Sequence, residues 1–342
     1  IAYHSEQADL HEKARDYLQK AGDVAREAYQ NIEALDYYGR ALALKQVVNQ
    51  ETKFQLLSSR ENIYHLLGHR ESQQEEINQM ATLAGQLNDT PKLTEVYLRK
   101  ARFAHITGEH LSVIAAAKKA IELAQQNNDA TQLANAHIIW CKALFWQGDY
   151  AGAREHAQSS LNFLKYVEDM AGEEQAHTYL GRIGMHQGNY FLTDFHYRKG
   201  LQIAQSLGNR KVEGDILNNI GLMLTHQQNY MAAKSNFEQA LALHREIGSR
   251  EGEGSALNNL GIIAHVLGQY EEAYFYYEQS LFISREVGTH QEEAIALNNL
   301  GEVAAKQQKH SEAVQFFLRA LEIERETGAR YLEAHTATML GF

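Results

Sequence analysis

The chain has 342 residues, a formal net charge of −11 and one proline, Pro91. The acidic balance argues against a general nucleic-acid binder, because neutralising phosphate groups requires a basic surface. A single cysteine, Cys141, excludes an intrachain disulfide and suits a reducing compartment, so we expect a cytoplasmic protein. No stretch approaches about eighteen consecutive apolar residues, so no membrane span is predicted.

Abundant Ala, Leu, Glu and Gln predict a chain that is almost entirely helical. Residues 1–45 contain two helical segments, Leu10–Ala28 and Ile32–Leu44, and form a degenerate N-terminal repeat or linker. Residues 46–127 follow as two degenerate helix pairs, whose turns at Gly68 and Gly108 keep a forty-residue phase. The four helices of this part are predicted at Glu51–Leu67, Glu71–Leu87, Lys92–Thr107 and Leu111–Gln126.

Residues 128–328 hold clear repeats. Helix pairs at 131–166 and 173–207 precede three near-copies at a forty-residue spacing, which are Asp215–Gly248, Ser255–Gly288 and Ile295–Gly328. Residues 329–342 begin another first helix, and because the chain stops just after Leu340-Gly341 we expect a fragment of a longer polypeptide. No long spacer interrupts the array, so we predict one continuous solenoid over residues 1–342.

Each copy reads as two amphipathic helices that must stack on their neighbours to bury their apolar stripes. In the middle copy the first helix places Leu257, Leu260, Gly261 and Ala264 on one face, and the second carries Ala273, Tyr277, Ser280 and Leu281. A side chain at Gly261 would hold the two helices apart. Gly288 is predicted as a left-handed helix cap, matched by Gly208, Gly248 and Gly328. Cys141 occupies the repeat position of Gly261, so we interpret it as a small buried thiol.

The pattern that recurs among the clear repeats is a Leu-Gly pair, a Gly-x-Tyr turn and then an Ala, an aromatic residue and an Ala-Leu pair. This pattern resembles the tetratricopeptide repeat (TPR). The forty-residue length, the LNNLG core and the REIG ending are most similar to the long repeats of kinesin light chains and Leu-Gly-Asn-repeat polarity adaptors. The resemblance implies an all-α fold, a right-handed superhelical solenoid of antiparallel helix pairs. Residues 1–45 also resemble the segment after the ATPase module in large bacterial signalling proteins, such as AAA-type nucleotide cyclases and MalT-like regulators.

In TPR proteins the first helices line a concave groove. Counting the repeat glycine as position eight, the groove-facing positions five and six are Asn218, Asn219, Asn258, Asn259, Asn298 and Asn299. Asparagine offers both donors and an acceptor, so such a series suits the backbone of an extended peptide, as the resembled subclass implies. The alternative is that some of these amides satisfy neighbouring helices or face water.

Towards the N-terminus the predicted groove changes to basic and aromatic residues, namely Arg99, Arg102, Lys142, Trp146, Tyr179, Arg182 and His186. Arginine beside aromatics suits an acidic or aromatic-bearing peptide, although intramolecular salt bridges explain any single arginine equally well. The carboxylate clamp of chaperone-binding TPR domains is not predicted, since Ser58 with Asn62 lacks its lysine.

The sequence contains no nucleophile elbow, P-loop, dinucleotide fingerprint or kinase signature, so we predict no enzyme and no cofactor. Although His65 and His69 are spaced i, i+4, Gly68 lies between them and no metal site is predicted. A pH-sensitive groove containing His186, His226 and His265 is a lesser alternative.

We therefore predict a protein-interaction scaffold that binds a peptide or partner helix, and forms the sensing part of a larger, bacterial cytoplasmic protein. No direct nucleic-acid or membrane partner is expected. The alternative is intramolecular regulation of an attached NTPase, nucleotide cyclase or DNA-binding domain.

Overall fold

The computed structural model describes residues 11–28 and 30–340, and within them the secondary structure is helical throughout. Leu10 and residues 341–342, which the sequence placed in or after terminal helices, lie outside the described residues. The first half contains α2 (His11–Glu27), α3 (Asn31–Ala43), α4 (Gln50–Leu67), α5 (Arg70–Leu87), α6 (Thr90–Ile106), α7 (His110–Asn127), α8 (Ala130–Trp146) and α9 (Tyr150–Leu164). The second half contains α10 (Met170–His186), α11 (Tyr190–Ser206), α12 (Arg210–His226), α13 (Tyr230–Glu246), α14 (Arg250–Val266), α15 (Tyr270–Val287), α16 (His290–Lys306), α17 (His310–Thr327) and α18 (Arg330–Leu340).

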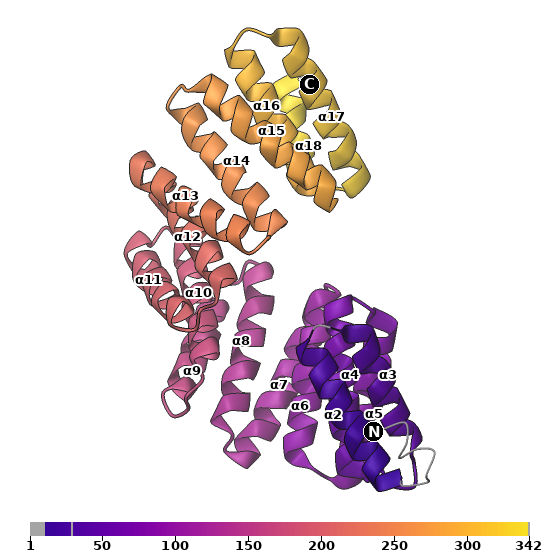
Figure 1. The fold of residues 1–342 in the computed structure, drawn as a ribbon. Coiled ribbons are helices and arrows are strands. Elements are labelled where there is room, and N and C mark those ends of the chain that lie inside the picture. Colours follow the sequence, from indigo (N-terminus) through magenta and orange to yellow (C-terminus); the bar gives the residue numbers. More distant parts are fainter. Residues whose placement is uncertain (1–10, 29, 341–342) are drawn as a thin grey trace. The chain divides into compact units, whose positions relative to one another are not determined.

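The chain divides into two compact units, residues 1–168 and 169–342, which we call the N-terminal and C-terminal units. Within each unit, consecutive helices pack side by side as hairpins, for example α6 with α7 and α14 with α15 (Figure 1). The all-α fold of paired helices is thus confirmed. A single continuous solenoid over residues 1–342 stays a prediction.

Helix ends follow the turn chemistry of the sequence. Asp89, Asp129 and Asn209 each accept a hydrogen bond from a backbone N–H in the first turn of the helix that follows. Gly288 ends α15 in the left-handed conformation with φ 79°, which a residue without Cβ adopts at no steric cost. The three matching glycines also have positive φ, so the predicted caps are confirmed.

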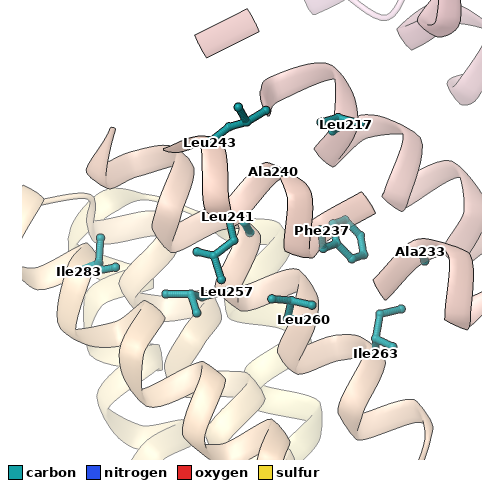
Figure 2. Packing of buried hydrophobic residues seen from close by; sticks show 11 residues of the cluster. Leu217, Ala233, Phe237, Ala240, Leu241, Leu243, Leu257, Leu260, Ile263 and Ile283 are labelled. Carbon is teal, nitrogen blue, oxygen red and sulfur yellow. The ribbon is translucent and has the colours of Figure 1, made fainter. Parts of the chain in front are cut away.

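In each hairpin of the three clear repeats, a glycine of the first helix contacts a buried ring of the second. A Cβ built on Gly221 would lie 2.5 Å from Cε1 of Phe237, and this ring is fully buried in the core shown in Figure 2. At the same repeat positions the N-terminal unit has Cys141 and Ala157, both fully buried. In the hairpin of α8 and α9 the larger residue on the first helix is thus matched by a smaller one, in place of the ring, on the second.

Candidate functional site

The asparagines of the three clear repeats pair with each other across neighbouring first helices. Nδ2 of Asn259 on α14 donates to Oδ1 of Asn218 on α12 at 2.9 Å. One repeat further on, Nδ2 of Asn299 on α16 donates to Oδ1 of Asn258 at 2.8 Å. We call these four residues the asparagine ladder. In each pair, position six of one repeat donates to position five of the repeat before it.

The LNNLG sequence explains why the ladder lies where it does. Leu257 and Leu260 are buried in the core of α14, and the helical period turns the two asparagines between them toward the neighbouring first helices. Asn258 and Asn299 remain half-buried, whereas Asn259 is only 7% exposed. The ladder is therefore partly a packing element and partly accessible.

The ladder ends where the neighbouring repeat lacks an asparagine. Nδ2 of Asn298 donates to Oε1 of Glu324 at 2.8 Å, and its amide also exchanges hydrogen bonds with the hydroxyl of Thr336 on α18. Asn298 and Glu324 are both buried. At the other end, Thr178 holds position five before Asn219 and instead donates to Glu174. The predicted asparagines thus divide between the ladder and interior contacts, and their contact with a ligand stays a prediction.

The other predicted groove residues of the C-terminal unit lie on α10. The guanidinium of Arg182 lies over the ring of Tyr179, 5.1 Å from its centroid, which is a cation–π geometry. Partial desolvation, followed by the positive charge of Arg182, lowers the pKa of His186. The structure therefore places these three residues on one helix, and their contact with a ligand stays a prediction.

In the N-terminal unit Arg99 is committed to intramolecular partners. Its guanidinium donates to Ser58 at 2.6 Å, to Asn62 at 3.0 Å and to Glu95 at 2.8 Å, and it also pairs with the buried carboxylate of Glu61. Arg99 itself is buried. Arg99 therefore forms intramolecular salt bridges, which was the alternative interpretation of this residue. The side chain of Arg102, by contrast, is exposed.

The remaining predicted groove residues of this unit lie on α8. Lys142 is half-buried, and Trp146 is exposed beside the ring of Phe145, with the two centroids 5.7 Å apart in an edge-to-face arrangement. An exposed indole offers a large apolar surface with one N–H donor.

Sequence reasoning missed a cavity of about 530 Å³ beside the ladder residue Asn258, bounded by α12, α14, α15 and α16. It also missed two histidine pairs with a common geometry. Nδ1 of His137 lies 2.9 Å from Nδ1 of His156, and Nδ1 of His177 lies 2.9 Å from Nδ1 of His196. Because both members recur at a forty-residue offset, comparing the repeats position by position would have revealed the histidine pairs.

Two classes of site are absent from the described residues. Among residues 11–28 and 30–340, no group of three or more His, Cys, Asp or Glu side chains could hold a metal ion. Likewise, no helix in the described part of the chain combines the length and apolarity that crossing a bilayer requires.

The repeat sequence and the fold both match known proteins. The tetratricopeptide-repeat family model matches residues 212–286 and 252–326. No curated protein matches the chain in sequence. Together with the helix pairs described above, the family match identifies residues 212–326 as tetratricopeptide repeats.

Three solved structures illustrate the likeness of fold. The apo form of the quorum sensor NprR from B. thuringiensis is 12% identical with a TM-score of 0.71, and the match covers 94% of this chain and 92% of that one. A Rap protein complexed with Competence and Sporulation Factor is 17% identical with a TM-score of 0.63, covering 84% and 79%. A Signal Transduction ATPase with Numerous Domains (STAND) protein with a tetratricopeptide repeat sensor, from Pyrococcus horikoshii, is 16% identical with a TM-score of 0.70, covering 95% and 50%. This chain therefore spans half the length of the STAND protein, and these low identities concern the fold alone.

Proposed function

We propose that the C-terminal unit binds an extended peptide along its first helices, and that the asparagine ladder holds the peptide backbone. The observation that carries the proposal is the pairing within the ladder. In the second pair, Asn258 uses its carbonyl oxygen and Asn299 uses its amide nitrogen. This pair therefore still presents N–H donors from Asn258 and a carbonyl acceptor from Asn299, which are the groups that complement a peptide unit.

Pre-pairing also favours binding through entropy. A free asparagine side chain loses rotamer freedom when a ligand fixes it, whereas a paired side chain has already lost that freedom on folding. Half-burial of Asn258 and Asn299 further strengthens their hydrogen bonds relative to those made in water. Backbone contacts of this kind bind without regard to sequence, so the side chains beside the ladder would select the ligand.

The length of the ligand follows from helix packing. First helices of successive layers lie roughly 8–10 Å apart and an extended residue spans about 3.3 Å, so each layer meets about three residues. The four first helices α10, α12, α14 and α16 would accommodate about twelve residues. The proposed function is that of a binding module without catalysis. The cysteine, Cys141, is a buried free thiol, which fits a cytoplasmic location of the protein.

The experiment is selection from a library of random peptides about twelve residues long, displayed on phage and captured by the immobilised chain. We expect recovery of a family of related peptides by the wild-type chain. The matched variant is Asn258→Ala combined with Asn299→Ala, which should recover far fewer. Equal recovery by both chains would reject binding through the ladder.

A second candidate function is regulation of an attached catalytic domain. The similarity to a STAND protein with a tetratricopeptide repeat sensor, of which this chain covers half, favours it. In that case a selected peptide should change the rate of nucleotide hydrolysis by the longer polypeptide. No change at saturating peptide would argue for a scaffold that acts through binding alone.

A further inference from the structure

The cavity beside the ladder exists because one repeat has a small residue at a position where its neighbours have large ones. His244 on α13 is only 1% exposed and lies between two glycines of the first helices. A Cβ on Gly214 would lie 2.9 Å from His244 Cε1, and one on Gly252 would lie 2.2 Å from His244 Nδ1. The histidine therefore fills the space between α12 and α14 completely.

The equivalent residues in the next two repeats differ in size. Forty residues after His244 the chain has Ser284 on α15, and forty residues later Glu324 on α17. Glu324 is fully buried and accepts hydrogen bonds from Asn298 and Thr336. Ser284 is also buried, but its short side chain leaves the space between α14 and α16 unfilled. The result is the cavity of about 530 Å³, which is within the size range of ligand sites.

The charged groups around this cavity are mainly carboxylates. Asp215, Glu251 and Glu292 contribute three carboxylates, and Lys211 contributes one ammonium. The buried hydroxyls have already donated their hydrogens, because Ser280 donates to the carbonyl of Gly254 at 3.0 Å and Ser284 to that of Leu281 at 2.9 Å. Their oxygen lone pairs remain as acceptors.

The carboxylates that line the cavity outnumber its one ammonium group, so its net charge is negative. Partial burial raises the pKa of Asp215, the charges of His244 and Lys211 lower it, and the charge of Glu251 adds a smaller rise. Apolar surface from Ile283, Val287 and Ile295 also lines the space. A long side chain with an aliphatic stem and a positive head matches both properties, since its methylene groups pack on apolar atoms while its head meets carboxylates.

We propose that this cavity receives a lysine or arginine side chain of the bound peptide, as a specificity pocket next to the backbone-binding ladder. The inference rests on the peptide-binding function proposed above, which supplies the cation. Asn258 belongs to both features, because it lines the cavity and accepts from Asn299. A peptide held at this asparagine would therefore have a neighbouring side chain within reach of the carboxylates.

The test uses two small probes with the full chain. N-acetyl-L-arginine N-methylamide carries the guanidinium, and N-acetyl-L-citrulline N-methylamide has a neutral ureido group of the same length. Binding is followed by NMR of the isoleucine methyl groups. We expect the arginine probe to shift the signals of Ile283 and Ile295 but not that of Ile323, and to bind at least about tenfold more tightly than the citrulline probe. Equal affinity of the probes, or shifts elsewhere only, would overturn the proposal.

Two variants distinguish the contribution of the cavity volume to probe binding from that of the carboxylate charges. Ser284→His should abolish probe binding by filling the cavity as His244 fills its own site. Asp215→Asn combined with Glu251→Gln removes two charges without changing the size of either side chain, so it keeps the test decisive if the histidine variant does not fold. We expect that double variant to weaken binding at least about fivefold. Glu326→Gln removes an exposed carboxylate of α17 outside the cavity and should leave affinity unchanged, and equal loss in both would contradict the pocket.

Peptide selection distinguishes this pocket from the groove itself. Peptides selected by the wild-type chain should share a lysine or arginine at one position, and Ser284→His should remove that preference while still capturing peptides. Captured peptides without a shared cation would reject the pocket and leave the ladder proposal standing. Probe binding without any captured peptide would reject the peptide-binding function, and with it a peptide residue as the source of the cation.

Discussion

The ring of Tyr277 lies directly against the backbone of Gly261, so that a Cβ on the glycine would be 2.5 Å from Cε1 of the ring. Both residues belong to the hairpin of α14 and α15, and Tyr277 is only 1% exposed. This contact sets how closely the two helices approach. The same relationship recurs between Gly181 and Tyr197 and between Gly301 and Phe317.

Gly261→Ala should therefore destabilise the C-terminal unit, by about 1–3 kcal/mol, because the new methyl group overlaps a ring that has no room to move. Urea unfolding followed by circular dichroism measures the change. The matched control is Gly39→Ala in α3, where no atom lies within 4 Å of the added Cβ, so its helix should be unchanged or slightly more stable. Equal effects of the two substitutions would show that the glycine–ring contact does not limit packing.

The combination of Cys141 with Ala157 suggests a rescue of the Gly261 variants. Gly261→Cys alone should be destabilising, but together with Tyr277→Ala it recreates that combination. The two substitutions should then cost less together than the sum of their separate costs, which a double-mutant cycle measures. Strict additivity would mean that the sizes of the two residues are not coupled.

Arg99 and Arg102 should respond differently to substitution, although the sequence grouped them. Arg99→Ala would leave the buried carboxylate of Glu61 without its guanidinium, so we expect a loss of about 3–5 kcal/mol in unfolding free energy. Arg102→Ala changes an exposed side chain and should stay within about 0.5 kcal/mol. Similar values for both would contradict a structural role for Arg99.

The histidine pairs predict a loss of stability in mild acid. Burial, and then the charge of the partner ring, lowers the pKa of His137 and of His196 to about 4. An unfolded histidine takes up its proton near pH 6.5, so between about pH 6.5 and 4 the unfolded chain binds more protons than the folded one. Stability should thus be constant above about pH 7 and fall by roughly 1–2 kcal/mol per pair on going to about pH 5.

Urea unfolding at a series of pH values above about 5, where most carboxylates remain ionised, checks this dependence. His137→Gln combined with His196→Gln should flatten the curve in this range. His290→Gln, which changes an exposed residue at the start of α16, should not. A curve that the first pair of substitutions leaves unchanged would show that the histidine pairs do not cause the acid sensitivity.

Much of the fold could be predicted from the sequence because the same turn and cap residues recur in each repeat. The forty-residue phase placed the turns, and a cap such as Gly288 marks its helix end through local backbone chemistry alone. The small residue Gly261 and the ring of Tyr277 could likewise be assigned to one hairpin, because helical periodicity places both on the apolar stripe.

The pairing of Asn218 with Asn259 could not be read in this way, because it depends on how one first helix is offset against the next. The interior position of Asn298 depends on Thr336, which lies in a part of the chain where the repeat pattern is less regular. The cavity at Ser284 left a signal in the sequence, namely a small residue aligned with His244 and Glu324. That signal becomes interpretable only once the position is known to be buried.

The most direct test of peptide binding by the asparagine ladder is the dissociation constant of a library-selected peptide, measured by fluorescence anisotropy with three chains. Compared with the wild-type chain, Asn258→Ala combined with Asn299→Ala should raise the dissociation constant at least about tenfold. The free energy of unfolding should fall by no more than the loss of one hydrogen bond, about 1 kcal/mol. Asn236→Ala on α13, whose side chain donates to the carbonyl of Ala232, should leave the dissociation constant as it is. Affinity that is unchanged in the ladder variant would contradict the ladder as the peptide site.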